Sequence, residues 1–255
     1  EKPAINTDYL LSERQRDFVV VSDKALSDFV LSFDVEIVSG AYAVFFRVDP
    51  GNDGYMLDGG ALGTMRNLAT TGPSKWFARE ASLLPAPGKH ALRLVVIGQR
   101  ILVFRNAARV ISASNELFSH GLIGLAESGQ GAIYVDELSI KQLLGVKAVR
   151  ASGMSPDGSF HIAILSSLSA DGFDAAAELD LATLTFGKTG EERSIASASP
   201  GTSQACEAQD VNADGREDVV CRVDQRLAGL TAEDPVGVLF GLTKAGDLVG
   251  SIVQF

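Results

Sequence analysis

The chain has 255 residues, of which 46% are hydrophobic and 21% are charged, a globular composition that excludes a disordered chain. The net charge is −10, and residues 145–255 carry most of it, with 16 acidic and 8 basic residues. This acidity argues against nucleic acid or an anionic membrane as a partner and suits a divalent cation. No apolar run approaches the roughly 18 residues of a membrane-spanning helix, so we expect no membrane span.

Short alternating runs dominate the first 144 residues. Within 29–38, the polar residues Ser32, Asp34 and Glu36 alternate with apolar ones, the period of a half-buried strand. Helical periodicity is confined to short pieces near 8–14 and 114–119. Many short strands separated by turn signals are typical of a sandwich or jelly roll. The predicted strands cover residues 29–38, 42–49, 91–98, 101–106, 121–127 and 132–140.

The pattern breaks near residues 143–150, where the charge balance also changes, and we place a domain boundary between residues 144 and 145. Residues 145–255 then form a second, smaller β-sandwich of ordinary domain size. The fold class expected for the whole chain is all-β. The strands predicted in this second part cover residues 160–167, 181–187, 218–223, 236–243 and 248–255.

The stretch 88–142 resembles concanavalin A-like jelly rolls of the laminin G and 3-keto-disaccharide hydrolase type. The likeness extends over about residues 15–142 and implies a fold found in secreted bacterial proteins that include glycan binders, enzymes and spacers. Ala107 departs from the pattern, which usually has Gly after the Asn. The matching residues are Gly88, His90, Leu92, Val95, Gly98, Ile101, Val103, Asn106, Gly121, Ile123, Gly124, Leu125 and Asp136.

The second part is similar to a small β-sandwich repeated in secreted bacterial proteins, through the strings IAILSS, FDAAAELDLATLTFGKTGEE, DVNADGREDVV and GLTKAGDLVGSIV. Its acidic loop resembles the calcium loops of dockerin and thrombospondin type 3 repeats. Calcium binds six to eight oxygen atoms from carboxylates, amides and carbonyls, which this spacing supplies. The predicted calcium ligands are Asp210, Asn212, Asp214, Asp218 and the carbonyl group of Arg216.

An EF-hand is excluded, because Cys221 replaces the acidic residue at the twelfth position of the loop and a strand follows instead of a helix. No histidine lies near the loop, so the predicted ion is structural rather than catalytic. The alternative is an Asp/Asn/Gly turn that holds no ion.

The two cysteines, Cys206 and Cys221, are close in sequence and are predicted to form a disulfide worth about 3 kcal/mol, the alternative being two buried thiols. The stretch EKPAINTDYL lacks the apolar segment of a signal peptide. The chain is therefore either cytosolic or the mature form left after a leader is removed. Calcium and a disulfide favour an extracellular or cell-surface protein.

Catalytic motifs are missing from the sequence. It contains no G-x-S-x-G, H-E-x-x-H or P-loop string, and residues 1–144 lack the E-x-D-x-x-E pattern of jelly-roll glycosidases. Asp34 and Glu36 share one strand face, which we interpret as solvated. We therefore predict a protein that is not an enzyme.

Sugar binding needs an aromatic platform and a few planar polar groups. For Trp76, the only tryptophan, a packing role is an equally good interpretation, and for Arg47 the alternative is an ordinary solvated strand position. The exposed-looking candidates are Arg47, Asp49, Tyr55, Asp58, Trp76 and Glu127.

The predicted function is that of a secreted, non-catalytic bacterial surface protein that binds glycan, or another surface polymer, or mediates adhesion through its jelly roll. The alternative is a structural subunit of an extracellular fibre or surface layer that self-assembles through its β-domains. A glycoside hydrolase with an unrecognised site is the weaker alternative.

Overall fold

The computed structural model describes residues 19–59, 61–65, 75–79, 86–151, 153, 155, 157–167, 172–195, 205–231 and 235–255, the side chains of Val19, Met65 and 127–131 excepted. The chain divides into two compact units, Glu1–Gln142 and Leu143–Phe255. The division lies two residues before the predicted boundary, because β10 (Leu144–Gly145) pairs in parallel with β17 (Leu248–Gln254) of the second unit. None of the helices described here is long and apolar enough to cross a membrane.

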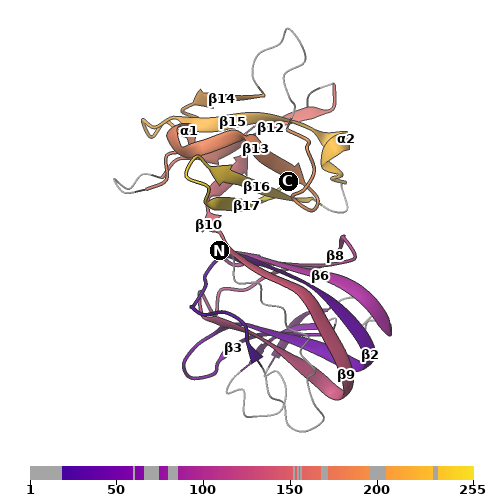
Figure 1. Cartoon of the computed structure of the whole chain (residues 1–255). Coiled ribbons are helices and arrows are strands. Elements are labelled where there is room, and N and C mark those ends of the chain that lie inside the picture. Colours follow the sequence, from indigo (N-terminus) through magenta and orange to yellow (C-terminus); the bar gives the residue numbers. More distant parts are fainter. Residues whose placement is uncertain are drawn as a thin grey trace. The chain divides into compact units, whose positions relative to one another are not determined.

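The first unit is built on one nine-stranded sheet with the order β5-β4-β3-β2-β6-β7-β8, in which β9 pairs with β2 and β1 (Figure 1). All its strand pairs are antiparallel. The strands are β1 (Val19–Val20), β2 (Phe29–Val48), β3 (Gly54–Asp58), β4 (Ala61–Met65), β5 (Lys75–Arg79), β6 (Gly88–Ile97), β7 (Arg100–Arg105), β8 (Ala108–Ser114) and β9 (Leu122–Gln142).

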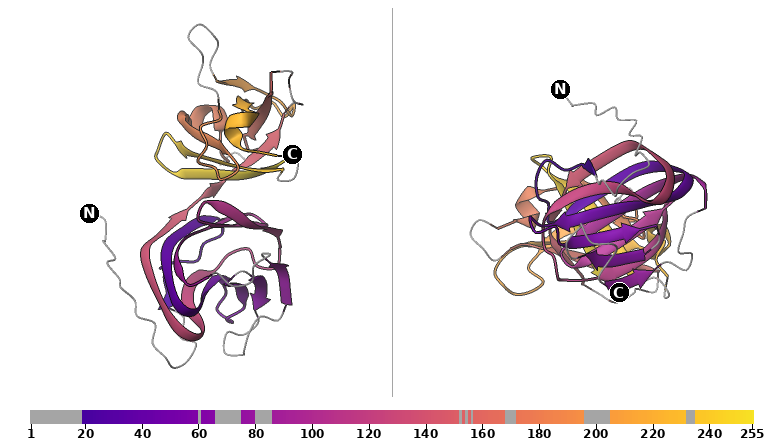
Figure 2. Two further views of the ribbon diagram at one scale, coloured as in Figure 1. Left: turned by 90° about the vertical axis from the view of Figure 1, so that its right-hand side faces the viewer. Right: turned by 90° about the horizontal axis from the view of Figure 1, so that it is seen from below.

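Two long strands, β2 and β9, turn this sheet into a sandwich, as its curl in Figure 2 shows. The first half of β2 pairs with β6 and with the second half of β9, whereas its second half pairs with β3 and the first half of β9. Gly40 lies at the bend with a φ of 75°, a backbone conformation that glycine adopts without strain. The sequence predicts two strands in each of these segments, and the structure joins each pair into one bent strand.

The core lies between the two layers. Phe29, Leu31 and Phe33 alternate inward along β2, while Asp34 and Glu36 point to solvent, as the period-2 pattern predicts. Each such side chain removed from water contributes about 2 kcal/mol, which explains why the register of β2 is fixed. The all-β jelly-roll sandwich predicted for this part is confirmed.

Two local predictions fare differently. Residues 115–120 form an irregular segment rather than the short helix predicted near 114–119, and the aromatic ring of Phe118 packs against that of Tyr55 with centroids 5.1 Å apart. A tertiary contact therefore outweighs a weak helical pattern. The other predicted helix, at residues 8–14, lies outside the described residues.

The second unit contains two four-stranded sheets, with the orders β10-β17-β16-β13 and β11-β12-β15-β14. Two one-turn helices, α1 (Ala175–Glu178) and α2 (Gln225–Ala228), begin at the N-caps Asp174 and Asp224. The remaining strands are β11 (Lys147–Arg150), β12 (Ser159–Leu165), β13 (Leu179–Gly187), β14 (Cys206–Gln209), β15 (Asp218–Asp224) and β16 (Val236–Thr243).

The core of the second unit centres on three phenylalanines, Phe160, Phe186 and Phe255, whose ring centroids lie 4.9 to 6.2 Å apart with edge-to-face geometry. Gly237 lies against them: a Cβ atom built on it would be 2.3 Å from the ring of Phe186. The smaller β-sandwich predicted here is confirmed.

Candidate functional site

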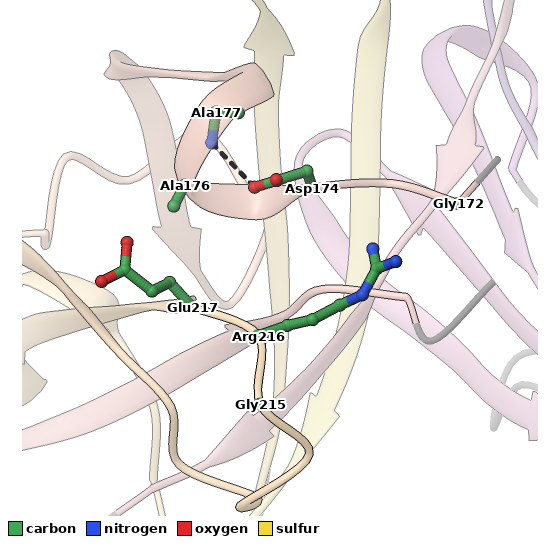
Figure 3. Close-up of a pocket in the computed structure, with 7 residues that line it drawn as sticks. All are labelled: Gly172, Asp174, Ala176, Ala177, Gly215, Arg216 and Glu217. Carbon is green, nitrogen blue, oxygen red and sulfur yellow. Dashed lines mark hydrogen bonds between the residues drawn. The ribbon is translucent and has the colours of Figure 1, made fainter. Parts of the chain in front are cut away.

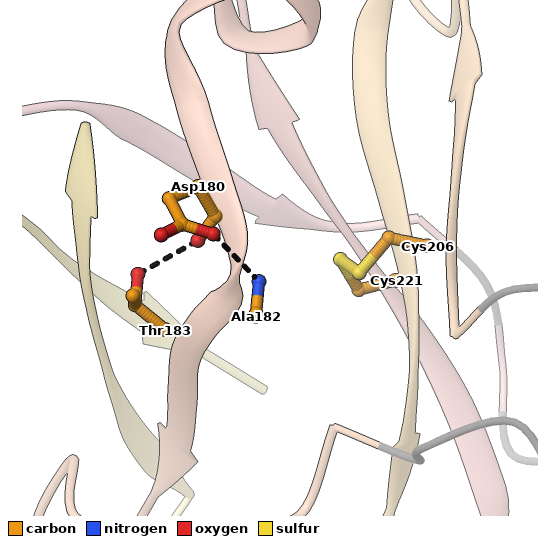
Figure 4. Close-up of a disulfide and its surroundings, with 5 residues drawn as sticks. All are labelled: Asp180, Ala182, Thr183, Cys206 and Cys221. Carbon is orange, nitrogen blue, oxygen red and sulfur yellow. Dashed lines mark hydrogen bonds between the residues drawn. A yellow bond between two sulfur atoms is a disulfide. The ribbon is translucent and has the colours of Figure 1, made fainter. Parts of the chain in front are cut away.

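The disulfide Cys206–Cys221 joins directly paired residues of β14 and β15 (Figure 4). Their Cα atoms are 4.1 Å apart, and both residues are buried in the core of the second unit. The predicted disulfide is confirmed. It fastens one end of the hairpin β14–β15, whose connecting loop of residues 210–217 is the predicted calcium loop.

Side-chain oxygens of this loop accept hydrogen bonds from its own backbone. Asp210 accepts from the N–H groups of Asp214 and Gly215, at 3.2 and 2.9 Å. Asn212 accepts from Asp214 at 3.0 Å, and Asp214 accepts from Arg216 at 2.9 Å. The side chains therefore turn back toward the loop that carries them, with Asp210 and Asn212 exposed and Asp214 half-buried.

Asp218 differs from the other acidic residues, because it is fully buried at the start of β15. Its carboxylate accepts from the N–H group of Ser166 at 2.9 Å and from that of Val211 at 3.1 Å. The hydroxyl group of Ser166 donates to the carbonyl oxygen of Glu217 at 2.7 Å and accepts from the N–H group of Ala175, the first residue of α1. Asp218 and Ser166 thus tie the loop to α1.

A hollow lies between the loop and α1 (Figure 3). Gly172, Ala176 and Ala177 leave it wide, and the acidic loop contributes Gly215, Arg216 and Glu217. The carboxylate of Asp174 caps α1 by accepting from the N–H group of Ala177 at 2.9 Å. The charged groups of the hollow are therefore the guanidinium of Arg216, the carboxylate of Glu217 and the carboxylate of the N-cap residue Asp174.

The loop could hold a cation only through the oxygen atoms of its side chains and backbone. In the described part of the chain, no three His, Cys, Asp or Glu side chains gather in a way that would hold a metal ion. Calcium also takes amide and carbonyl oxygens, which Asn212 and the carbonyl group of Arg216 supply. The donor types therefore fit calcium, but Asp218, through its buried bonds to Ser166 and Val211, is turned into the unit.

The expected exposure of Arg47 is wrong, since this residue is only 1% exposed. Its backbone has a φ of 51°, and its guanidinium donates to the carbonyl oxygens of Ser27, at 2.6 and 3.0 Å, and Phe118, at 2.9 Å. Asp28 lies 3.4 Å away as its counter-charge. Burial lowers the pKa of Arg47 below its usual value, an effect that Asp28 opposes. Arg47 therefore fastens the segment before β2 to residues 115–120.

Tyr55 is also buried rather than exposed, with 0% of its surface accessible. Its hydroxyl group donates to the Asn115 side chain at 2.9 Å and accepts from the N–H group of Phe118 at 3.0 Å. Burial raises the pKa of Tyr55. The alternation in β3 directs this side chain into the core, so it belongs to the same fastening as Arg47.

The remaining candidates lie on different parts of the first unit. Asp49 accepts from the N–H groups of Gly51 and Asp53, and so shapes the loop between β2 and β3. Asp58 is half-buried at the end of β3, and Glu127 lies in β9 opposite Tyr42, with its side chain outside the described residues. The six residues predicted to bind sugar therefore do not lie together in one cluster.

Trp76 lies half-buried in β5, on the face of its layer opposite the core. A row of directly paired residues crosses this face from Phe45 through Met56 and Gly63 to Trp76. Phe45 and Met56 belong to a separate apolar cluster against which Trp76 packs. In the next row Asp58 pairs with Ala61, and Ala61 with Arg79. We call Phe45, Met56, Asp58, Gly63, Trp76 and Arg79 the Trp76 face.

Sequence reasoning missed Arg79, whose guanidinium carbon lies 5.8 Å from the centre of the Trp76 ring. The spacing of three residues within KWFAR contradicts simple alternation. A bulge between the pairs Leu62–Ala78 and Gly63–Trp76 returns both side chains to one face. The sequence signal that could have identified Arg79 is its position close to Trp76, an aromatic residue in an apparent loop.

The sequence matches no family model, and no curated protein matches it either. Solved structures similar to parts of the chain include a carbohydrate-binding module, CBM66, from Bacillus subtilis, with 23% identity and a TM-score of 0.42 over 48% of this chain and 80% of that one. A galectin-like protein from Bacillus subtilis has 12% identity and a TM-score of 0.42 over 54% and 83%. A tetrameric galectin from the sponge Cinachyrella has 11% identity and a TM-score of 0.38 over 49% and 99%.

Proposed function

We propose that this chain is a secreted, non-catalytic bacterial surface protein that binds glycan, or mediates adhesion, through the Trp76 face. The observation that carries the proposal is the arrangement of Trp76, Arg79 and Asp58 above an apolar floor. A sugar ring stacks its C–H face on an aromatic ring, while planar cations and carboxylates bind its hydroxyl groups. Trp76 is anchored by its packing on the apolar cluster that contains Met56 and Phe45, so little side-chain entropy is lost when a ligand binds.

Binding is favoured over catalysis by the number of acidic groups. Glycoside hydrolysis uses two carboxyl groups on either side of the bond. Among the described side chains of the Trp76 face there is one carboxylate, that of Asp58. This supports a glycan-binding role rather than the weaker alternative of a hydrolase.

A glycan array probed with the full chain tests this proposal. We expect binding that falls at least tenfold in Trp76→Ala, the loss that removal of an interfacial aromatic anchor commonly produces. Tyr134→Ala is the matched control, because Tyr134 is 44% exposed on β9 and lies outside the Trp76 face. Binding that is equal in both variants, or an array without any signal, contradicts the proposal.

We also propose that the loop of residues 210–218 binds a structural calcium ion. The support is the set of oxygen donors at alternating positions, three of them from the exposed or half-buried Asp210, Asn212 and Asp214. A buried disulfide next to the loop also suits an oxidising, extracellular setting in which calcium is plentiful.

Calcium binding is tested by the melting temperature of the second unit with calcium and with a chelator. A ligand present at a hundred times its dissociation constant stabilises by about 2.7 kcal/mol. We expect a calcium-dependent rise in the wild type that is abolished in Asp214→Ala and kept in Asp157→Ala, an exposed acid outside the loop. A wild-type melting temperature that is the same with and without calcium refutes the proposed calcium site.

The second candidate function is assembly into a fibre or surface layer, and the observation that favours it is the edge of β9. Along residues 132–142 no strand in the described part of the chain pairs with the outer side of β9. Asp136 and Glu137, the latter with a φ of 49° at a bulge, restrict such pairing to part of this edge. Sedimentation tests this function: reversible oligomers that form as the concentration rises would support assembly, and a monomer at every concentration contradicts it.

A further inference from the structure

Two cations flank Trp76 on β5. Lys75 and Arg79 are both exposed, although the whole chain carries a net charge of −10. Within the described part of the chain, β5 pairs with β4 and forms an edge of its sheet. The two positive charges therefore stand at an accessible border of the Trp76 face.

The acidic residues that the structure describes do not pair with either cation. No carboxylate in the described residues forms an ion pair with Lys75 or Arg79. The acidic member of the Trp76 face, Asp58, is separated from Arg79 by the intervening strand β4, a distance of about 9.6 Å between the outer strands. That separation is about one Debye length in physiological salt, so Asp58 offsets the charge of Arg79 only in part.

Arg79 is held in a defined place by the aromatic ring. A guanidinium over an indole ring is attracted by the ring and keeps its N–H donors in its own plane. Those donors match the two oxygens of a carboxylate or a sulfate group. A pyranose ring beside Trp76 would present such a group to Arg79, whereas Lys75 supplies a second charge along the same strand.

We infer that the glycan recognised by the Trp76 face is anionic, a polysaccharide whose sugars carry carboxylate or sulfate groups. This inference rests on the proposed glycan-binding function and specifies its substrate class. Trp76 supplies the stacking surface, Arg79 the paired donors for the anion, and Lys75 the longer-range attraction. Binding by these charges weakens as salt rises, whereas stacking does not.

The test measures binding of the full chain to polygalacturonate, to its fully methyl-esterified form, to dextran sulfate and to dextran. The first and third carry carboxylate and sulfate, and the second and fourth are their neutral counterparts. We expect at least tenfold weaker binding to the neutral partner of whichever anionic polymer binds. Arg79→Gln should reduce the anionic binding by about tenfold, the usual cost of losing a charge-assisted bond.

Lys89→Gln is the matched control for charge, since its side chain is 82% exposed on β6 and it removes the same charge outside the Trp76 face. Fluorescence of Trp76, the only tryptophan, checks that Arg79→Gln and Lys89→Gln are folded, and far-UV circular dichroism does so for Trp76→Ala. Equal binding to the charged and neutral polymers, sensitive to Trp76→Ala but not to Arg79→Gln, overturns the anionic specificity and leaves the glycan-binding function standing. Anionic binding that Lys89→Gln weakens as much as Arg79→Gln also overturns it, and binding to no glycan overturns both.

Discussion

Replacing Arg47 by Leu should destabilise the first unit strongly. The substitution removes the donors of four hydrogen bonds and leaves the carbonyl oxygens of Ser27 and Phe118 without these donors beside an apolar side chain. The Asp28 carboxylate loses its counter-charge and keeps the hydrogen bond that it accepts from the N–H group of Gly98. An unpaired buried acceptor costs about 1–3 kcal/mol, and removing one partner of a buried ion pair costs about 3–5 kcal/mol. Water reaches Asp28, which is 18% exposed, so we expect a total loss near 4 kcal/mol.

Urea unfolding followed by tryptophan fluorescence measures this loss, because the only tryptophan lies in the first unit. Arg47→Lys keeps the positive charge but lacks the planar guanidinium group, and it should lower the free energy of unfolding by roughly half as much. Lys89→Leu removes an exposed cation 3.7 Å from Glu36 and should cost under about 1 kcal/mol. A loss under about 1 kcal/mol for Arg47→Leu would refute the fastening role of this residue.

Three further predictions concern other parts of the fold. Replacing Cys206 and its partner cysteine by Ala should lower the stability of the second unit by about 3 kcal/mol in calorimetry, and an unchanged melt contradicts this. Burial raises the pKa of Tyr42 far above 10, so the unfolded chain releases this proton first and stability falls as pH rises above 10. Urea midpoints between pH 9 and 11 should fall less in Tyr42→Phe, and equal slopes would exclude Tyr42 as the cause. Gly237→Ala places a methyl group 2.3 Å from Phe186 and should cost about 1–3 kcal/mol in thermal unfolding, unlike Gly153→Ala, which meets nothing within 4 Å.

The sequence predicted those features of the fold that depend on local patterns. Alternation identified the buried residues in the first half of β2, residues 29–37, because one face of that half meets the core. At the bend near Gly40, the sequence predicted a break between two strands, 29–38 and 42–49, because a turn and a bend have the same residue types. Only the pairing with β9, almost a hundred residues away, keeps the chain extended through it.

The candidate sites were harder to predict, because side-chain direction depends on bulges and on distant partners. Arg47 lies in an apparently regular strand, yet its positive φ turns it toward Ser27 and Phe118, and no local pattern announces those acceptors. The register shift that puts Arg79 beside Trp76 is likewise set by β4. The disulfide was predictable, because two cysteines that are close in sequence and flank one turn have few other partners.

The hairpin β14–β15 joins these arguments. Its disulfide fixes the strands, and Asp218 anchors the loop end to Ser166 and Val211, so the loop is held without any ion. The second unit would then fold without calcium, and a bound ion would stabilise only the loop by neutralising the carboxylates of Asp210 and Asp214. Removal of calcium by a chelator should therefore speed up amide hydrogen exchange in residues 210–217. Exchange in β15 and in the first unit should stay unchanged. Loss of protection throughout the second unit would show instead that the ion, and not the disulfide and Asp218, holds the sandwich together.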